Sequence, residues 1–158
     1  MKAKNCLIFG GTGQIGRNLI RKLAKNNYKV TVITRNAHTK GNFIKTQANA
    51  GYIEIIETNP FDEKAIKPYF EKADICINLV GILFEKGKKD SFDNIHANFP
   101  MMLAKLSHQN KIEQFIPLSA LGVDKALDSK YAISKLKGEK NVFKCFNTSL
   151  ILRPSVVY

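Results

Sequence analysis

Tyr131 and Lys135 are the residues whose types and spacing could do proton chemistry. They are four positions apart, so on a helix they share one face, where the ammonium group could lower the pKa of the tyrosine hydroxyl. A tyrosinate stabilised in this way can act as general acid or base at a carbinol or carbonyl, while the lysine holds a cofactor ribose. Ser119 follows an apolar run, and its hydroxyl could hydrogen-bond the reacting oxygen. The spacing alone is common, and a surface tyrosine beside a solvated lysine is the alternative.

A glycine-rich turn with the spacing G-x-x-G-x-x-G is the second chemical feature. We expect Gly10 to allow a tight turn, Gly13 to leave room for a pyrophosphate, and Gly16 to let the following helix pack closely on the strand. The N–H groups and the positive dipole end of that helix would face the phosphates. The turn follows the apolar run 6–9 and opens an amphipathic helix at Gln14. That context favours nucleotide binding over a purely structural turn.

The end of the second apolar run, 30–33, bears on the choice of cofactor. A protein that prefers NAD usually places Asp or Glu there to accept from the ribose 2′-OH, whereas this run is followed by Thr34, Arg35 and Asn36. The guanidinium of Arg35 could bind a 2′-phosphate, with Arg17 as a second clamp. The sequence therefore predicts a preference for NADP(H) over NAD(H). The alternative is that Arg35 is a solvated loop residue.

Alternating patterns along the chain must position these residues. Apolar runs predict strands at 6–9, 30–33, 52–57, 73–81, 114–119 and 148–152. Amphipathic patterns predict helices from Gln14, within 43–50, from 61–62 with Asp62 as N-cap, over 91–109 and over 128–145, with 35–42 as a polar loop. Pro100 either kinks the fourth of these helices or marks its start, and Pro117 is awkward for a central strand. Six strands alternating with helices predict an α/β fold with a doubly wound parallel sheet and ligands at the carboxyl ends of its strands.

Composition limits the classes of partner. The 158 residues fit one domain, and no run approaches the length that spans a bilayer. The net charge is +12, but the 21 lysines are spread along the chain and only four arginines are present, so we expect no specific nucleic-acid binding. Three cysteines without C-x-x-C spacing and three scattered histidines predict reduced thiols, a cytoplasmic location and no metal site.

The glycine turn, the serine and the tyrosine–lysine pair, in this chain order, resemble the short-chain dehydrogenase/reductase superfamily in its extended or atypical branch. The matching segments are 10–16, 78–81, Ser119, Tyr131, Lys135 and 152–158. A narrower resemblance, in 8–13, 78–83, 118–122 and 153–158, is to the nucleotide-binding accessory subunit of respiratory complex I and its bacterial relatives. It implies an NAD(P)-binding Rossmann domain over residues 1–158 that holds NADPH tightly in a cofactor-holding or assembly role.

The resemblance also implies residue roles. The catalytic set would be Ser119, Tyr131 and Lys135. The cofactor would be bound by Gly10, Thr12, Gly13, Gln14, Ile15, Gly16, Arg35, Asp62, Asn78, Val80, Gly81, Tyr131 and Lys135. For Asp62, helix capping explains the residue equally well. Family members continue past the Arg153-Pro154 segment into a smaller substrate lobe, which this sequence lacks, so we expect a protein partner or self-association on that side.

Two other functions stay open. The chain could belong to an active NAD(P)-dependent epimerase, dehydratase or reductase on a sugar nucleotide or another carbonyl substrate. It could also be a regulator that senses NADP(H) and binds another protein. The complex I resemblance adds a location at the inner face of a respiratory membrane, held peripherally without a transmembrane segment.

Overall fold

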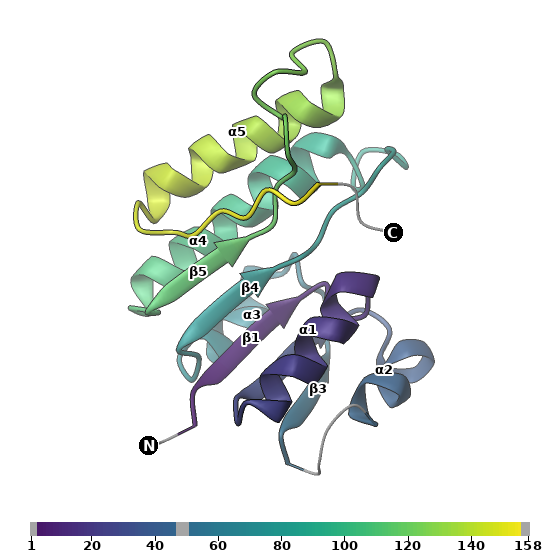
Figure 1. The fold of residues 1–158 in the computed structure, drawn as a ribbon, viewed down its shortest axis with the longest axis vertical. Coiled ribbons are helices and arrows are strands. Elements are labelled where there is room, and N and C mark those ends of the chain that lie inside the picture. The colour runs from purple at the N-terminus through teal and green to yellow at the C-terminus, as the bar shows by residue number, and fades with distance from the viewer. Residues whose placement is uncertain (1–2, 47–50, 156–158) are drawn as a thin grey trace. The chain divides into compact units, whose positions relative to one another are not determined.

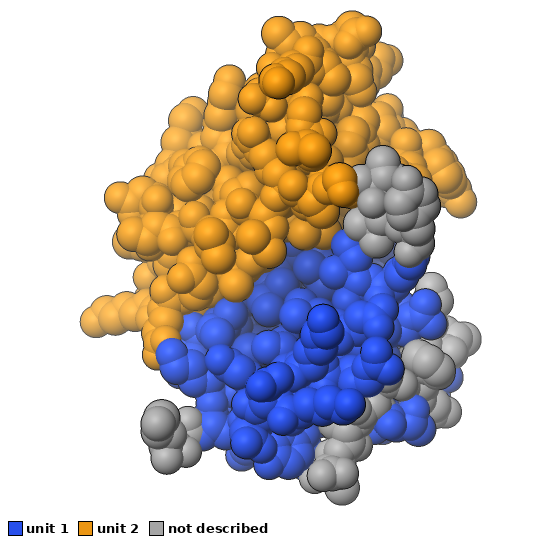
Figure 2. All heavy atoms as spheres, in the orientation of Figure 1, with its two compact units in different colours: residues 1–79 blue, residues 80–158 orange. Residues whose placement is uncertain are grey.

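A computed structural model describes residues 3–46 and 51–155. The chain divides into two compact units, residues 1–79 and 80–158, which are coloured separately in Figure 2. Within the described ranges, no helix is long and apolar enough to cross a membrane. The single domain predicted over residues 1–158 stays a prediction.

Four parallel strands form the sheet of the first unit (Figure 1). They are β1 (Asn5–Phe9), β2 (Lys29–Thr34), β3 (Ile53–Glu57) and β4 (Ile75–Asn78), in the order β3-β2-β1-β4. The register places Ile8 beside Val32 and Val32 beside Ile55, while the next residue of β1, Phe9, lies beside Ile33. Because side chains alternate along a strand, Ile8 and Phe9 face opposite sides of the sheet.

The helices of the first unit cover both of these faces. They are α1 (Gln14–Lys25), α2 (Ala37–Lys45) and α3 (Glu63–Phe70). On one face, Ile20 of α1 lies near Val32, and Gly41 of α2 lies against Ile55. On the other face, Phe70 of α3 lies 6.0 Å from Phe9, centroid to centroid. The unit is therefore doubly wound, as the alternating pattern predicted.

In the described part of the second unit there is one strand, β5 (Gln114–Pro117), and there are three helical segments, η1 (Asp93–Asn98), α4 (Phe99–Gln109) and α5 (Lys130–Cys145). The η1 segment is a turn of π-helix, in which the N–H of Phe99 donates to the carbonyl of Asn94, five residues back. Pro100 lies at the start of α4 and has no N–H to return to the carbonyl of His96, which is one physical reason why the α-helical ladder is interrupted here. The predicted helix over 91–109 is thus two segments, and Pro100 marks the start of the second.

Two expected elements are wrong in part. The polar loop predicted over 35–42 is mostly helix, because α2 begins at Ala37, where Glu57 accepts from the Ala37 N–H at 2.9 Å. The helix predicted within 43–50 is described only to Lys45, and residues 47–50 lie outside the described residues.

The sixth strand, predicted over 148–152, is only a single parallel bridge between Leu118 and Leu152. Hydrogen bonds nevertheless follow the line of β5, from the Leu150 N–H to the Phe115 carbonyl at 2.9 Å and from the Ser119 N–H to the Leu152 carbonyl at 2.7 Å. β4 and β5 are also shorter than the apolar runs that predicted them. Pro117 is the last residue of β5, where a missing N–H does least harm.

Candidate functional site

The glycine turn of the first unit connects β1 to α1. Gly10 has φ +79°, in the left-handed region where a side chain is strained, and its carbonyl accepts from the Gly13 N–H at 3.2 Å. Gly13 is the N-cap residue of α1 and supplies no side-chain cap to the helix. The first helical turn contains no acidic residue, so its dipole is not offset by a carboxylate there. This geometry fits an anion at the helix N-terminus.

Two glycines of the turn differ in the space around them. A Cβ added at Gly16 would lie 2.6 Å from the backbone of Gly11, whereas one added at Gly13 would meet only the Gly10 carbonyl oxygen, at 3.5 Å. Gly16 therefore lets the helix approach the turn itself rather than the strand that we expected. Gly13 is exposed, so its missing side chain leaves open space above the backbone. Thr12 lies in the same turn, and Gln14 and Ile15 are the first two residues of α1.

The other predicted cofactor residues of the first unit follow the carboxyl ends of its strands. Asn78 ends β4 beside Phe9, and the Leu79 N–H donates to the Phe9 carbonyl at 2.9 Å. Arg35 is exposed and directly follows β2. Asp62 caps α3, since its Oδ1 accepts from the N–H groups of Lys64 and Ala65. Strand register thus brings the turn, Asn78 and Arg35 to one edge of this sheet. The expectation that Asp62 caps a helix is confirmed.

Lys135 and Gly81 come together in the second unit. Lys135 is 7% exposed, and its Nζ donates to the Leu118 carbonyl at 3.1 Å. A Cβ added at Gly81 would lie 3.3 Å from that Nζ, so the turn after β4 runs close over the ammonium group. Burial lowers the pKa of Lys135 to about 8, while the charge of Glu139 opposes this shift. Val80 precedes Gly81 and is half-buried.

Tyr131 lies one turn before Lys135 on α5, with the Lys135 Nζ 5.9 Å from the centre of its ring. We expected the lysine to lower the pKa of the tyrosine hydroxyl, and for this structure that expectation is wrong, because burial raises the pKa of Tyr131. The Lys135 ammonium already donates to a carbonyl. Tyr131 is therefore held protonated, which suits a proton donor.

Ser119 follows β5 by two residues. Its backbone N–H is fixed by the Leu152 carbonyl, while its Oγ is buried and has no hydrogen-bond partner among the described residues. A buried hydroxyl without a partner costs free energy unless a ligand or water completes it. The Ser119 hydroxyl could therefore hydrogen-bond a reacting oxygen, which is the role that the sequence predicts for it.

Sequence reasoning missed two groups that surround Lys135. Glu139 is buried and receives two hydrogen bonds from the guanidinium of Arg153, at 2.8 and 2.6 Å. His96 is 3% exposed, although the three histidines looked scattered in the sequence. One signal could have found it, because His96 lies four residues after Phe92 on the predicted apolar helix face.

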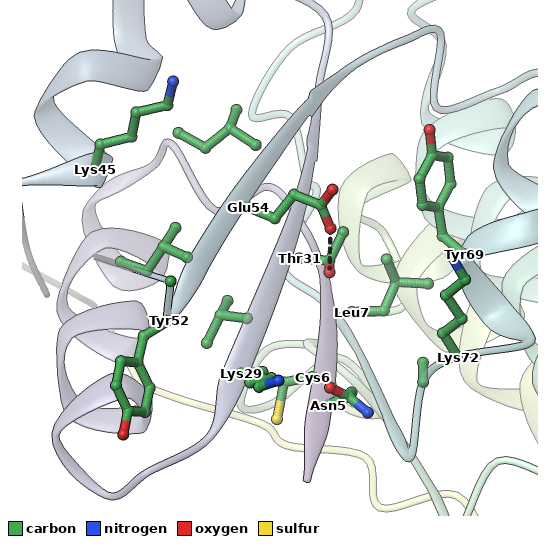
Figure 3. A pocket seen from close by; sticks show the side chains of 15 residues that line it. Asn5, Cys6, Leu7, Lys29, Thr31, Lys45, Tyr52, Glu54, Tyr69 and Lys72 are labelled. Carbon is green, nitrogen blue, oxygen red and sulfur yellow. Dashed lines mark hydrogen bonds between the residues drawn. The ribbon is translucent and has the colours of Figure 1, made fainter. Parts of the chain in front are cut away.

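The hollow in Figure 3 lies away from the glycine turn. Its lining includes the first residues of β1, β2 and β3, with Tyr69 and Lys72 beside them, and Thr31 donates to Glu54 at 3.4 Å. The turn instead follows the last residue of β1. Among the described residues, no group of three or more His, Cys, Asp or Glu could hold a metal ion. The cysteines at 6, 76 and 145 are free thiols.

The doubly wound sheet and the glycine turn from β1 into α1 define a dinucleotide-binding α/β protein of the Rossmann type. Residues 10–149 match the sequence profile of a family described as NAD(P)H-binding. The chain belongs to this NAD(P)H-binding family.

Curated relatives match nearly the whole of this chain but are longer. Subunit 9 of the NADH dehydrogenase (ubiquinone) 1 alpha subcomplex, mitochondrial, from Mus musculus is 28% identical over 151 residues, which are 96% of this chain and 40% of the mouse protein. The protein of the same name from Arabidopsis thaliana is 28% identical over 95% of this chain and 37% of its own length. The chain thus spans about two-fifths of the length of these curated relatives.

Solved structures share the fold. A UDP-glucuronic acid 4-epimerase from Bacillus cereus, in complex with NAD, superposes with a TM-score of 0.80 over 98% of this chain and 56% of the epimerase, at 22% identity. At this identity the likeness shows the fold alone. It agrees with the predicted Rossmann class.

Proposed function

We propose that this chain is the cofactor-holding part of a protein of the complex I accessory type, and that it prefers NADP(H) to NAD(H). The observation that carries the preference is the end of β2, where the exposed Arg35 stands in place of the carboxylate that would accept from a ribose 2′-OH. A guanidinium offers charge-assisted, bidentate hydrogen bonds to a phosphate.

The surroundings of Arg35 support the same choice. Glu57, at the end of the neighbouring strand, has a carboxylate, but that group accepts from the Ala37 N–H at 2.9 Å and lies 3.9 Å from His38. This hydrogen bond places the Glu57 carboxylate at the start of α2. In this proposal Gly10, Gly13 and the N-terminus of α1 hold the pyrophosphate, because the turn presents backbone without side chains.

The role as a holding subunit is supported by the relatives. The mouse and Arabidopsis proteins are named as subunits of mitochondrial NADH dehydrogenase (ubiquinone). The match to each of them extends over nearly the whole length of this chain. We propose that the protein associates peripherally with a respiratory complex at the inner face of its membrane. Exposed apolar side chains of the second unit suit a protein partner or a second copy, among them Leu121, Leu127, Leu150 and Leu152.

Calorimetric titration with NADPH and NADH tests the cofactor preference. We expect Arg35→Asp to weaken NADPH by about 100-fold, since a phosphate partner is lost and repulsion is added, and to change NADH by less than about 3-fold. Arg21→Asp is the matched control, because Arg21 is an exposed arginine that hydrogen-bonds Asn18 on α1. Equal losses of both cofactors in Arg35→Asp would remove the 2′-phosphate assignment.

Turnover is the second candidate function, and one observation favours it. The buried Ser119 hydroxyl, the protonated Tyr131 and the buried Lys135 form the set that an NAD(P)-dependent reductase or epimerase would use. Cofactor oxidation by the chain in its natural full-length context, with carbonyl substrates and sugar nucleotides, tests this function. Turnover lost in Tyr131→Phe would favour the enzyme, whereas co-purification with respiratory-complex subunits without turnover would favour the holding role.

A further inference from the structure

His96 is a buried titratable residue that the proposed chemistry does not use. It lies in the π-helical turn η1, and its carbonyl faces Gly138 of α5 so closely that a Cβ at Gly138 would overlap the carbonyl oxygen. Turns of π-helix occur often at functional sites. This one carries a buried imidazole between α5 and the segment that follows β4.

Both ring nitrogens of His96 are hydrogen-bonded, and the pattern fixes the tautomer. The Ile82 N–H donates to Nε2 at 3.1 Å, so Nε2 carries no proton. Nδ1 therefore carries the proton and donates to the Ser134 Oγ, 2.9 Å away. The Ser134 hydroxyl in turn donates to the Tyr131 carbonyl at 2.7 Å. One chain of hydrogen bonds thus runs from the loop after β4 to the backbone of Tyr131.

The faces and edges of the His96 ring are also occupied. Phe92 stacks on it with the centroids 5.4 Å apart, and Tyr131 meets it edge to face at 5.2 Å. The space of the missing Gly81 side chain separates the ring from the ammonium group, since a Cβ there would lie 3.7 Å from Nε2 and 3.3 Å from the Lys135 Nζ. Burial, together with the Lys135 charge, lowers the pKa of His96 to about 3, so the imidazole is neutral near pH 7.

We propose that His96 is a positioning residue that holds the phenol ring of Tyr131 and the Gly81-Ile82 turn in fixed places through a neutral, Nδ1-protonated imidazole. The inference rests on the second candidate function, in which Tyr131 transfers a proton, and on the expected place of Gly81 in the cofactor site. A neutral ring is the form that the site needs. A protonated imidazole would lose the Ile82 hydrogen bond and would place a second positive charge beside Lys135.

Two variants separate the hydrogen bonds from the packing of the ring. His96→Phe keeps an aromatic ring between Phe92 and Tyr131 but leaves the Ile82 N–H and the Ser134 hydroxyl without this partner. His96→Gln can return an acceptor to the Ile82 N–H and is the conservative rescue. His108→Phe is the matched control, because His108 is exposed on α4, where its ring lies 6.2 Å from that of Phe146, centroid to centroid.

The readouts are amide hydrogen exchange at Ile82 and the affinity for NADPH. In His96→Phe we expect exchange at Ile82 to speed up by about 10-fold or more and NADPH binding to weaken by about 10-fold, since a half-buried donor loses its partner. His96→Gln should recover most of both losses, and His108→Phe should change neither. A purely structural role would lower stability without moving exchange at Ile82 selectively.

Nitrogen-15 spectra of the histidines in the wild-type chain test the tautomer without any variant. We expect a protonated Nδ1 and an unprotonated Nε2 on one histidine down to about pH 4. A protonated Nε2, or unchanged Ile82 exchange and NADPH affinity in a folded His96→Phe, would overturn the inference. If the wild-type chain does not bind NADPH at all, the proposed function fails, while the tautomer and the exchange at Ile82 still decide the structural part.

Discussion

The two units offer a cofactor different kinds of chemistry. The first unit presents backbone, in the form of a glycine turn at the N-terminus of α1, together with the exposed Arg35 that follows β2. The second unit presents buried ionisable side chains, Lys135 and His96, whose pKa values burial has shifted. The difference shows that the candidate residues of the first unit depend on the absence of side chains, whereas those of the second unit depend on their burial.

The largest effect is expected at Gly138 of α5, which lies directly against the His96 carbonyl of η1. Gly138→Ala would place a methyl group on the His96 carbonyl, which belongs to an interrupted helix and cannot give way without moving η1. We expect unfolding free energy to fall by about 4 kcal/mol, which urea denaturation followed by circular dichroism measures. A loss below about 1 kcal/mol would show that η1 and α5 do not pack as described.

Alanine substitutions at Gly16 and Gly13 in the first unit should have different effects on stability. Gly16→Ala would meet the Gly11 backbone at 2.6 Å, so we expect a loss of about 3 kcal/mol in unfolding free energy. Gly13→Ala meets only one atom, at 3.5 Å, and should keep stability within about 1 kcal/mol. NADPH affinity should nevertheless fall in Gly13→Ala by about 10-fold or more. Equal stability losses in both variants would contradict the distinction between the two glycines.

Acid should destabilise the second unit through His96. The folded pKa of about 3 lies below the ordinary 6.5, so between these values the unfolded chain binds a proton that the folded chain does not. Stability that is present above pH 6.5 is therefore lost as the pH falls toward 3, by up to about 1.4 kcal/mol per pH unit. His96→Phe should lack this contribution. Urea denaturation of both proteins at pH 7.5, 6 and 4.5 checks it, and parallel pH profiles would count against a neutral buried His96.

The smallest effect is expected at Lys137, on the exposed surface of α5. Lys137 donates to Asp93 at 2.9 Å, but both side chains are more than half exposed. Exposed ion pairs contribute little, so Lys137→Ala should change unfolding free energy by less than about 0.5 kcal/mol. It is also a control for Gly138→Ala, the neighbouring position on α5. A loss of 2 kcal/mol or more would mean that surface charge, rather than packing, joins η1 to α5.

Features that depend on local spacing could be predicted from the sequence. The glycine turn, the helix after it and the Asp62 cap require particular residues at fixed offsets, and the structure contains each of them. α2 was missed because its N-terminus is completed by Glu57, which is distant in sequence. The sixth strand was overestimated, since 148–152 has the right residues but pairs with β5 at one bridge only.

The candidate site of the second unit was predictable only in its residue types. The spacing of Tyr131 and Lys135 indicated one helix face, and α5 confirms that placement. Their protonation could not be predicted, because it depends on burial. Burial raises the pKa of Tyr131, and the carbonyl of Leu118 holds Lys135. The hydrogen bonds of His96 could not be predicted either, because its partners Ile82 and Ser134 lie 14 and 38 residues away in the sequence.

The most direct test of the central claim is calorimetric titration of NADPH into the wild-type chain and into Gly13→Val. The chain contains no tryptophan, so the fluorescence of NADPH itself provides an independent record of binding. We expect micromolar binding to the wild-type chain and a loss of about 100-fold in Gly13→Val, because bulk would occupy the place of the pyrophosphate. Wild-type binding weaker than about 1 mM, or equal affinity in the two proteins, would contradict the account.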